Sequence, residues 1–304
     1  MRIISLIASA TEIVCALGFE DQLVGRSHEC DFPATVLKLP ACSEPKINIH
    51  TTSAEIDRQV KEVVRDSLSV YRVDVEQLKC LNPDVIITQD HCEVCAVSLK
   101  DVEAAVCNWL DSRPQIVSLR PDALKDIWLG IEQVAAALGN CDKGKQLVQD
   151  LKDQMQAIVK QIPQNHTKPT VACIEWIDPL MAAGNWIPEL VAMAGAIDVF
   201  GVAGKHSPWM TFAELQKKDP DYIITMPCGW DIERTREEMY LLTEQKGWSE
   251  LKAVKSNRVF ITDGNQFFNR PGPRVVESLQ ILTEILYSRN TSSLQFKMKA
   301  WQTI

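Results

Sequence analysis

One short unit occurs twice in this chain of 304 residues, and this repeat constrains the fold more than any other feature of the sequence. The copies are Asn-Pro-Asp-Val-Ile-Ile-Thr at 82–88 and Asp-Pro-Asp-Tyr-Ile-Ile-Thr at 219–225, and the stretches before them begin near Val75 and Phe212. Proline fixes φ and disfavours the α conformation in the residue before it, so a helix must end at each turn. Each copy therefore predicts a short helix, a turn and a buried strand, and two copies predict two similar lobes.

Apolar runs of strand length alternate with helical patterns in both halves of the chain. We expect strands at 2–7, 23–25, 85–88 and 116–119 in the first half, and at 170–174, 222–225 and 259–262 in the second. This alternation is typical of an α/β fold with a central parallel or mixed sheet in each lobe. Ser9 or Thr11 is expected to cap the first helix, with Glu12 in its first turn.

Two helices are predicted between the halves. From Asp122, apolar residues recur every three or four positions until residue 139, and a second such pattern covers 141–162, which spans roughly 30 Å at about 1.5 Å per residue. We therefore predict an N-terminal α/β lobe at 1–120, a helical linker at 121–163 that includes the long backbone helix at 141–162, a C-terminal α/β lobe at 168–288, and a loose tail at 289–304. Phe296 and Trp301 are the tail residues that could dock.

Composition favours a globular protein that binds no nucleic acid. Hydrophobic residues make up 46% and charged residues 24%, and the net charge of −8 repels a phosphate backbone. No stretch reaches the roughly 18 consecutive apolar residues of a membrane span, and the N-terminal apolar run is too short for a secretory signal. As the sequence stands, we expect a cytoplasmic protein, or a periplasmic one if the true start lies upstream. The ten cysteines are scattered through apolar elements, and we interpret most of them as reduced core residues.

Residues that follow the predicted strands are candidates for a binding site, because ligands of open α/β sheets collect beyond the carboxyl ends of the strands. In the first half these residues are Ser9, His28, Cys30, Asp31, Asp90 and His91. In the second half they are Trp176, Trp186, Trp209, Cys228, Trp230, Phe267 and Arg270. Five of the eight tryptophans, at 176, 186, 209, 230 and 248, lie in or near loops of the second half. Each could cap the core, but together they favour a ligand with a broad flat face, such as cobalamin, haem or an aromatic siderophore.

His91, Cys92 and Cys95 form a second cluster, with the spacing His-Cys-x-x-Cys. Two cysteines at this spacing can hold one metal ion, to which an imidazole can add a further ligand. The same pair could act in redox chemistry or pack as apolar side chains. His28 or His91 could instead bind the metal of a macrocycle through a neutral imidazole nitrogen.

The motifs of common enzymes are absent from the sequence. It has no Gly-x-Ser-x-Gly, no glycine-rich phosphate loop, no His-Glu-x-x-His and no dinucleotide fingerprint. We therefore expect a binding protein without catalytic residues.

Several motifs resemble those of the cobalamin-binding substrate-binding proteins of ABC importers, a group with two lobes joined by one rigid helix. The matching segments are Arg-Ile-Ile-Ser-Leu at 2–6, Ala-Thr-Glu at 10–12, Val-Gly-Arg-Ser-His-Glu-Cys-Asp-Phe-Pro at 24–33, both copies of the repeat, Ser-Pro-Trp at 207–209, and Phe-Phe-Asn-Arg-Pro-Gly-Pro-Arg at 267–274. The repeat is shared across the wider superfamily, whereas the order of the segments and the tryptophan-bearing loops favour the cobalamin branch.

The resemblance implies that one bulky, flat ligand lies in a cleft between the lobes. The residues that would line this cleft are the loop after Thr88, Trp176, Trp209, the turn at 228–230 and Phe267. The long helix would limit the lobes to small movements. Glu76 lies where family members present a glutamate to the permease, while the second such place falls on Ala213, with Glu214 one position further.

We predict a protein that binds a corrinoid, either as an importer component that docks on an ABC permease or as a cytoplasmic carrier or sensor. Three alternatives stay open. The first is a metal-binding or redox protein that uses His91, Cys92 and Cys95, with a metal ion at the two cysteines. The second is a binder of haem or a siderophore, and the third is an enzyme on this scaffold that reduces or releases such a ligand.

Overall fold

The computed structural model describes residues 1–65, 70–90, 99–106, 114–163, 167–287 and 294–304. The chain divides into two compact units. Unit 1 comprises residues 1–51, 55–121 and 125–151, and unit 2 comprises residues 52–54, 122–124 and 152–304. Among the helices of the described segments, none combines the length and the apolar character that a membrane crossing requires.

Unit 1 is built on an all-parallel sheet with the strand order β2-β1-β5-β6. The strands are β1 (Ile3–Ser5), β2 (Leu23–Arg26), β5 (Val85–Gln89) and β6 (Gln115–Leu119). All five side chains of β5 are buried, as is typical of an interior strand in a parallel sheet. A separate antiparallel pair consists of β3 (Ser43–Pro45) and β4 (Tyr71–Val73).

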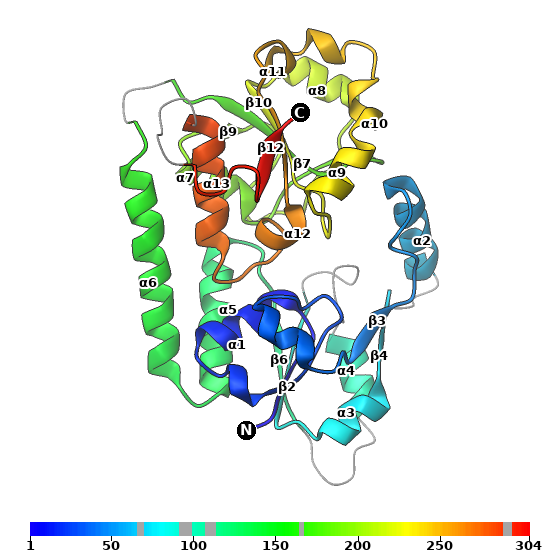
Figure 1. The fold of residues 1–304 in the computed structure, drawn as a ribbon, viewed down its shortest axis with the longest axis vertical. Helices are drawn as coiled ribbons and strands as arrows, with labels where there is room; N and C mark the ends of the chain where they lie inside the picture. Colours follow the sequence, from blue (N-terminus) through cyan, green and yellow to red (C-terminus); the bar gives the residue numbers. More distant parts are fainter. Residues whose placement is uncertain (66–69, 91–98, 107–113, 164–166, 288–293) are drawn as a thin grey trace. The chain divides into compact units, whose positions relative to one another are not determined.

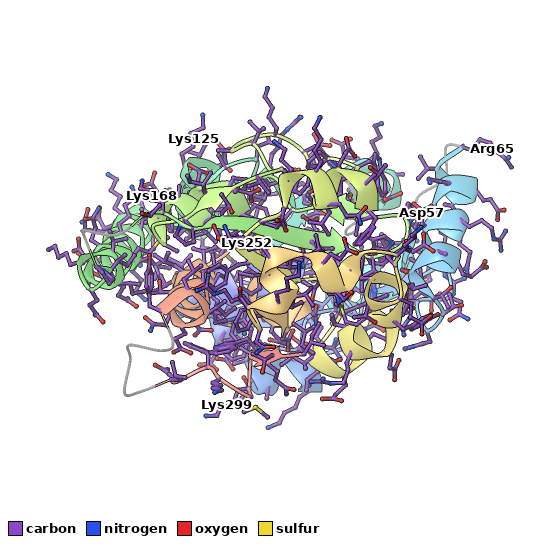
Figure 2. The ribbon with its side chains drawn as sticks, turned by 90° about the horizontal axis from the view of Figure 1, so that it is seen from above. Asp57, Arg65, Lys125, Lys168, Lys252 and Lys299 are labelled. Atoms are coloured by element: carbon purple, nitrogen blue, oxygen red, sulfur yellow. The ribbon has the colours of Figure 1, made fainter. Side chains whose placement is uncertain are left out.

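Six helices belong wholly or mainly to unit 1. They are α1 (Ala8–Ala16), α2 (Ser53–Arg65), α3 (Val75–Leu81), α4 (Leu99–Val106), α5 (Leu124–Ala137) and the first part of α6 (Cys141–Lys160). α2 is largely exposed, because only two of its 13 side chains are buried. Charged side chains pair along its surface, as between Arg58 and Glu55, and Figure 2 shows Asp57 and Arg65 on the same helix.

Unit 2 contains a mixed sheet with the strand order β12-β11-β10-β7-β8, and β9 also pairs with β7. The strands are β7 (Thr170–Trp176), β8 (Met181–Ala182), β9 (Ile197–Asp198), β10 (Tyr222–Thr225), β11 (Val259–Thr262) and β12 (Trp301–Thr303). β7, β9, β10 and β11 are parallel, whereas β8 and β12 are antiparallel to their neighbours. The helices are α7 (Ile187–Met193), α8 (Phe212–Lys218), α9 (Ile232–Glu238), α10 (Tyr240–Thr243), α11 (Lys252–Lys255), α12 (Gly264–Phe267) and α13 (Val275–Tyr287).

The fold class predicted from the sequence is confirmed, since each unit has a parallel or mixed sheet with helices between its strands (Figure 1). Each of the seven predicted strands is present. α6 is an uninterrupted helix of 20 residues that runs from unit 1 into unit 2 and matches the helix predicted at 141–162. The boundary between the units falls inside α6, between residues 151 and 152.

The repeated segment has the same structure in both units. α3 and α8 each end at a residue with left-handed backbone, at φ 40° and 41°, and the Pro-Asp turn and an interior strand follow. The aspartate of each turn fixes the start of the neighbouring strand. Asp84 Oδ2 accepts a hydrogen bond from Arg2 N at 2.7 Å, and Asp221 Oδ2 accepts one from Thr170 N at 2.8 Å. The repeat therefore extends from the sequence to individual hydrogen bonds.

The predicted cap of the first helix is wrong. α1 begins after Ile7, and no side chain accepts a hydrogen bond at its N-terminus. Ser9 and Thr11 lie inside the helix and are buried, and Thr11 Oγ1 lies 3.0 Å from Cys30 Sγ. Both residues lie beyond the N-cap position, which Ile7 occupies, so neither side chain can cap the helix.

The described part of the tail predicted at 289–304, residues 294–304, is not loose. β12 pairs with β11, and Trp301 is only 1% exposed. Glu284 on α13 holds this segment, because its buried carboxylate accepts hydrogen bonds from Gln295 N, Phe296 N and Trp301 Nε1 at 2.9, 3.1 and 3.0 Å. One buried carboxylate and one edge strand order the segment, and neither leaves a periodic pattern in the sequence.

Substitution Glu284→Gln is expected to lower the free energy of unfolding by about 1–3 kcal/mol, because hydrogen bonds to a buried charged acceptor are lost. Urea unfolding monitored by tryptophan fluorescence measures this change. Glu233→Gln changes an exposed glutamate of the same unit and should shift the value by less than about 0.5 kcal/mol. Equal effects of the two substitutions would contradict the role given to Glu284.

Candidate functional site

Two tryptophans pack together where two neighbouring parallel strands of unit 2 end. Trp176 is the last residue of β7 and Trp230 lies in the turn after β10, with ring centroids 5.1 Å apart and ring planes at 47°. Gly229 has a φ of 75°, a left-handed conformation that glycine adopts without strain, and it lets the chain turn immediately before Trp230. The pair therefore forms an aromatic cluster at the carboxyl edge of the sheet, where open α/β sheets bind ligands. Trp230 is only 6% exposed and Trp176 is half-buried, so Trp176 is the more accessible ring of the two.

Arg234 in the first turn of α9 holds the ring of Trp230. Its guanidinium carbon lies 4.3 Å from the ring centroid, and its Nη2 donates to Glu238 Oε1 at 2.6 Å. Glu238 is 2% exposed and also accepts hydrogen bonds from the backbone and hydroxyl groups of Ser53, which belongs to the same unit. A buried carboxylate is stable when it is paired and fully hydrogen-bonded. The cation above Trp230 is therefore fixed by a buried ion pair.

Hydrogen bonds connect the neighbouring loops to this aromatic pair. Glu175 Oε2 accepts from Ser207 Oγ at 2.8 Å, and the same hydroxyl accepts from Gly184 N at 3.1 Å. Gly264 lies against the loop after β10, where a Cβ atom would come within 2.2 Å of Pro227 O, so a larger residue does not fit. The loops after β7, β10 and β11 and the segment around residue 207 thus form one connected surface.

The remaining tryptophan candidates of unit 2 differ in exposure. Trp209 is 58% exposed, and its backbone forms a bridge with Met181 at β8. Trp186 precedes α7 and is 6% exposed, and its indole N–H has no hydrogen-bond partner among the described residues. Trp248 stacks on Phe212 in the interior, with a centroid distance of 6.4 Å. Of these three tryptophans, Trp209 is the most exposed to solvent.

Cys228, Phe267 and Arg270 complete the predicted set in unit 2. Cys228 is half-buried in the turn that leads to Trp230. Phe267 ends α12, and its ring meets the edge of Phe296 at a centroid distance of 5.8 Å. Arg270 is 4% exposed, and its Nη2 donates to Asn265 Oδ1 at 3.2 Å. These side chains lie in the loops after β10 and β11, and direct contact with a ligand stays a prediction for each.

His28 is the best-defined polar candidate in unit 1. It follows β2, its Nδ1 lies 3.0 Å from Ser43 Oγ, and its ring centroid lies 5.4 Å from that of Tyr71. Its Nε2 makes no hydrogen bond within the described part of the chain and lies 3.8 Å from Glu29 Oε1. Burial, aided by the positive charge of Arg26, lowers the pKa of His28. The imidazole is therefore neutral at neutral pH and could offer one nitrogen lone pair.

The other candidates of unit 1 lie near the carboxyl ends of neighbouring parallel strands. Ser9 is 2% exposed in α1, and its hydroxyl has no partner among the residues that the structure describes. Cys30 is fully buried, Asp31 is half-buried, and Asp90 is exposed directly after β5. Ligand contact stays a prediction for all four.

His91, Cys92 and Cys95 lie outside the described residues, so the predicted metal or redox site stays a prediction. In the segments that are described, no group of three or more His, Cys, Asp or Glu side chains could hold a metal ion. The seven described cysteines are free thiols, of which three are buried and two are exposed, so the expected core role holds for only part of them. Burial raises the pKa of Cys42 to about 12, which keeps that thiol protonated and unreactive.

The two predicted docking residues lie in the first turn of the repeated helix, with Glu214 one position beyond the place that corresponds to Glu76. Glu76 is exposed on α3 and pairs with Lys79 at 3.0 Å. Glu214 is exposed on α8 and closes a capping box with Thr211, whose hydrogen bonds lower the pKa of the Glu214 carboxyl. Both carboxylates reach solvent, and docking through them stays a prediction.

The residues that support Trp230 were not predicted from the sequence. Arg234 follows Trp230 by four positions, and Glu238 follows Arg234 by four, the spacing at which side chains meet on a helix. This spacing is the feature of the sequence that could have identified both residues as supports of Trp230. Ser53 gave no signal, because 185 positions separate it from its partner Glu238.

Two similar α/β units that share one long helix, with aromatic and polar residues after their parallel strands, define a two-lobed binding protein for a small molecule. The chain belongs to the periplasmic binding protein family, whose sequence profile matches residues 3–265. Its relatives are substrate-binding proteins of ABC transporters, and the protein is accordingly a binding protein and not an enzyme. Membership implies a small-molecule ligand and a permease partner.

Two curated relatives match most of the chain. One is the uncharacterised ABC transporter substrate-binding lipoprotein YvrC of Bacillus subtilis, with 24% identity over 295 residues, which cover 94% of this chain and 80% of that protein. The other is the vitamin B12-binding protein of Vibrio cholerae, with 23% identity over 289 residues, which cover 92% of this chain and 86% of that protein. They confirm the resemblance noted in the sequence.

Solved structures of low identity share the fold. The apo form of the periplasmic haem-binding protein RhuT from Roseiflexus has a TM-score of 0.71 and 21% identity, and the match covers 95% of this chain and 98% of that one. The periplasmic vitamin B12-binding protein BtuF of Vibrio cholerae has a TM-score of 0.66 and 21% identity, with the same coverage. The fold therefore accommodates more than one kind of ligand.

Acidification is expected to destabilise the wild-type protein more than the variant His28→Gln. Because the pKa of His28 lies below its ordinary value of 6.5 in the folded state, the unfolded chain takes up the proton first. The contribution of His28 to the free energy of unfolding is therefore complete above about pH 6.5 and is lost as the pH falls through the folded-state pKa.

Urea unfolding of both proteins between about pH 7.5 and pH 5 measures the difference. The control His50→Gln replaces an exposed histidine of the same unit and should follow the wild type. Parallel pH curves for wild type and His28→Gln would show that His28 is not a buried neutral imidazole.

Proposed function

We propose that this protein binds a corrinoid of the cobalamin type at the aromatic carboxyl edge of unit 2. The proposal rests on one observation: Trp176 packs on the buried Trp230, and Met181, the strand partner of Trp176, forms a backbone bridge with Trp209, which is 58% exposed. A corrin ring presents a broad apolar face, and indole rings cover such a face at roughly 25 cal/mol per Å² of apolar area removed from water. Only part of that gain contributes to the free energy of binding, because ordering the ligand and the loop side chains opposes binding.

The rigidity of the aromatic pair supports this proposal. The ion pair of Arg234 with Glu238 keeps the buried ring of Trp230 in place, and Trp230 supports the ring of Trp176. Little side-chain freedom is therefore lost when a ligand covers Trp176. Glu175 and Ser207 lie beside Trp176 and place polar atoms next to the apolar surface. Corrinoids carry amide side chains around the ring, which such polar atoms would orient.

Relatives support a corrinoid and keep haem as the second candidate. A vitamin B12-binding protein matches 92% of this chain, whereas a haem-binding protein shares its fold. Haem iron takes an axial ligand from its protein, and neutral His28 is the described side chain that suits this role. The cobalt of cobalamin can bring its own base, so a corrinoid requires no such residue. A corrinoid could therefore bind at the aromatic pair without a histidine from the protein.

We place the protein in transport, as the component that delivers the ligand to an ABC permease. Glu76 and Glu214 are the residues that we propose for docking, since both carboxylates are exposed at the start of the repeated helix. A carrier or sensor role in the cytoplasm is the alternative, and it would need the ligand-binding surface without the docking residues.

Purified protein mixed with cobalamin should bind it one to one, as seen by calorimetry and by a shift in the visible spectrum. Trp209→Ala should weaken binding about tenfold or more, because a large aromatic contact at the ligand is lost. Trp209 is exposed, so its removal leaves the fold intact. The matched control is Tyr240→Ala, which removes a 48% exposed aromatic ring from α10 and should leave the affinity unchanged.

The same titration with haem distinguishes the two ligands. Binding of haem without cobalamin would overturn the corrinoid proposal and support the second candidate. Equal losses in Trp209→Ala and Tyr240→Ala would show that the ligand binds elsewhere.

A further inference from the structure

A cavity of about 340 Å³ lies at the opposite edge of the same sheet. It is lined by residues at the amino ends of β10 and β11, by β12, by the end of α13 and by Lys297. Asn257 and Arg258 immediately precede β11, and Tyr222 opens β10. The candidate ligand residues of unit 2, in contrast, follow the carboxyl ends of these strands. The cavity is therefore separate from the proposed corrinoid surface, and its volume suits a small molecule.

Two cations give this cavity its charge. Arg258 Cζ lies 5.0 Å from the ring centroid of Tyr222, and Lys297 Nζ lies 5.8 Å from that of Trp301. Neither cation forms an ion pair within the described segments. A guanidinium or ammonium group that rests on an aromatic face keeps its outer N–H groups free for a further partner.

The lining contains no acidic residue among the described ones, although the chain has 40 Asp and Glu residues and a net charge of −8. Asn257 and Thr303, both exposed, add neutral hydrogen-bond donors. The phenolic hydroxyls are already used, since Tyr222 donates to Leu286 O at 3.2 Å and Tyr287 donates to Ala194 O at 3.1 Å. The groups left for a ligand are therefore mainly cations and donors.

The walls of the cavity are held in place before any ligand binds. Trp301 is 1% exposed, and its indole N–H is fixed by Glu284 at 3.0 Å. Phe260 is 4% exposed and packs between Tyr222 and Trp301, with centroid distances of 6.2 and 5.6 Å. Because these rings are nearly closed off from solvent, polar groups contribute about as much of the accessible lining as apolar groups do, which suits a compact ligand with a charged group.

We propose that this cavity is a second binding site, defined by Arg258 and Lys297, which takes a small organic anion with a carboxylate or phosphate group. Arginine binds such groups through paired N–H donors, and lysine adds a point charge. The site is independent of the corrinoid proposal.

Calorimetry on the full chain, with citrate and with glycerol 3-phosphate as probes, tests the site at low ionic strength. The wild-type protein should bind at least one of the two probes with one-to-one stoichiometry. Arg258→Gln and Lys297→Gln should each weaken binding about tenfold, the usual loss for one charge-assisted hydrogen bond. Glycerol, which carries no charge, should not bind.

Lys299→Gln is the matched control, because Lys299 is an exposed lysine two positions from Lys297 and does not line the cavity (Figure 2). It should change the affinity by less than about twofold. Arg258→Gln could disturb the packing against Tyr222. Lys297 is exposed, so the effect of Lys297→Gln on binding can be interpreted even in that case.

Two results would overturn the proposal. One is that neither probe binds at concentrations up to about 10 mM, because a specific site of this kind should have a lower dissociation constant. The other is an equal loss in Lys297→Gln and Lys299→Gln, which would indicate general charge attraction. Cobalamin binding should be the same in Lys297→Gln and wild type, so failure here is distinguishable from failure of the corrinoid proposal.

Discussion

The hydrogen bond from a backbone N–H at the start of a strand, or immediately before it, to the aspartate of a Pro-Asp turn is the interaction on which each unit depends. Asp84 makes it to Arg2, and Asp221 makes it to Thr170. It sets where β1 starts beside β5 and where β7 starts beside β10. A slip of one residue would turn the buried side chains of a strand towards solvent, so this register is essential to the core. The same register brings the carboxyl ends of the paired strands to one edge.

Unit 2 consequently has two edges of different chemistry. At the carboxyl edge, the half-buried Trp176 packs on the buried Trp230, and Arg234, which lies over the ring of Trp230, is paired with Glu238. At the amino edge, the cations that line the cavity have no carboxylate partner within the described segments. β10 has four residues, which at about 3.3 Å each places the two edges roughly 13 Å apart along that strand. A flat apolar ligand and a small anion would thus not compete.

The sequence predicted those features that local patterns specify. Strand β5 is a short apolar run, α6 has an apolar face that repeats every three or four residues, and the Pro-Asp turns stop a helix by steric exclusion. The sequence did not predict features that depend on a contact between two residues far apart in the chain. Glu284 orders the C-terminal strand, and Ser53 binds Glu238, but neither residue differs in the sequence from an ordinary polar surface residue. Local patterns also did not predict which aromatic residues are buried, since Trp186 is buried whereas Trp209 is exposed.

Hydrogen exchange with and without cobalamin tests the central claim most directly, since it reports which backbone segments the ligand covers or rigidifies. The account predicts slower exchange of segments 176–178, 207–210 and 226–234 in the presence of cobalamin, while β12 and the residues around Arg258 exchange as before. Unchanged exchange in all three segments, under conditions in which cobalamin is bound, would contradict the account.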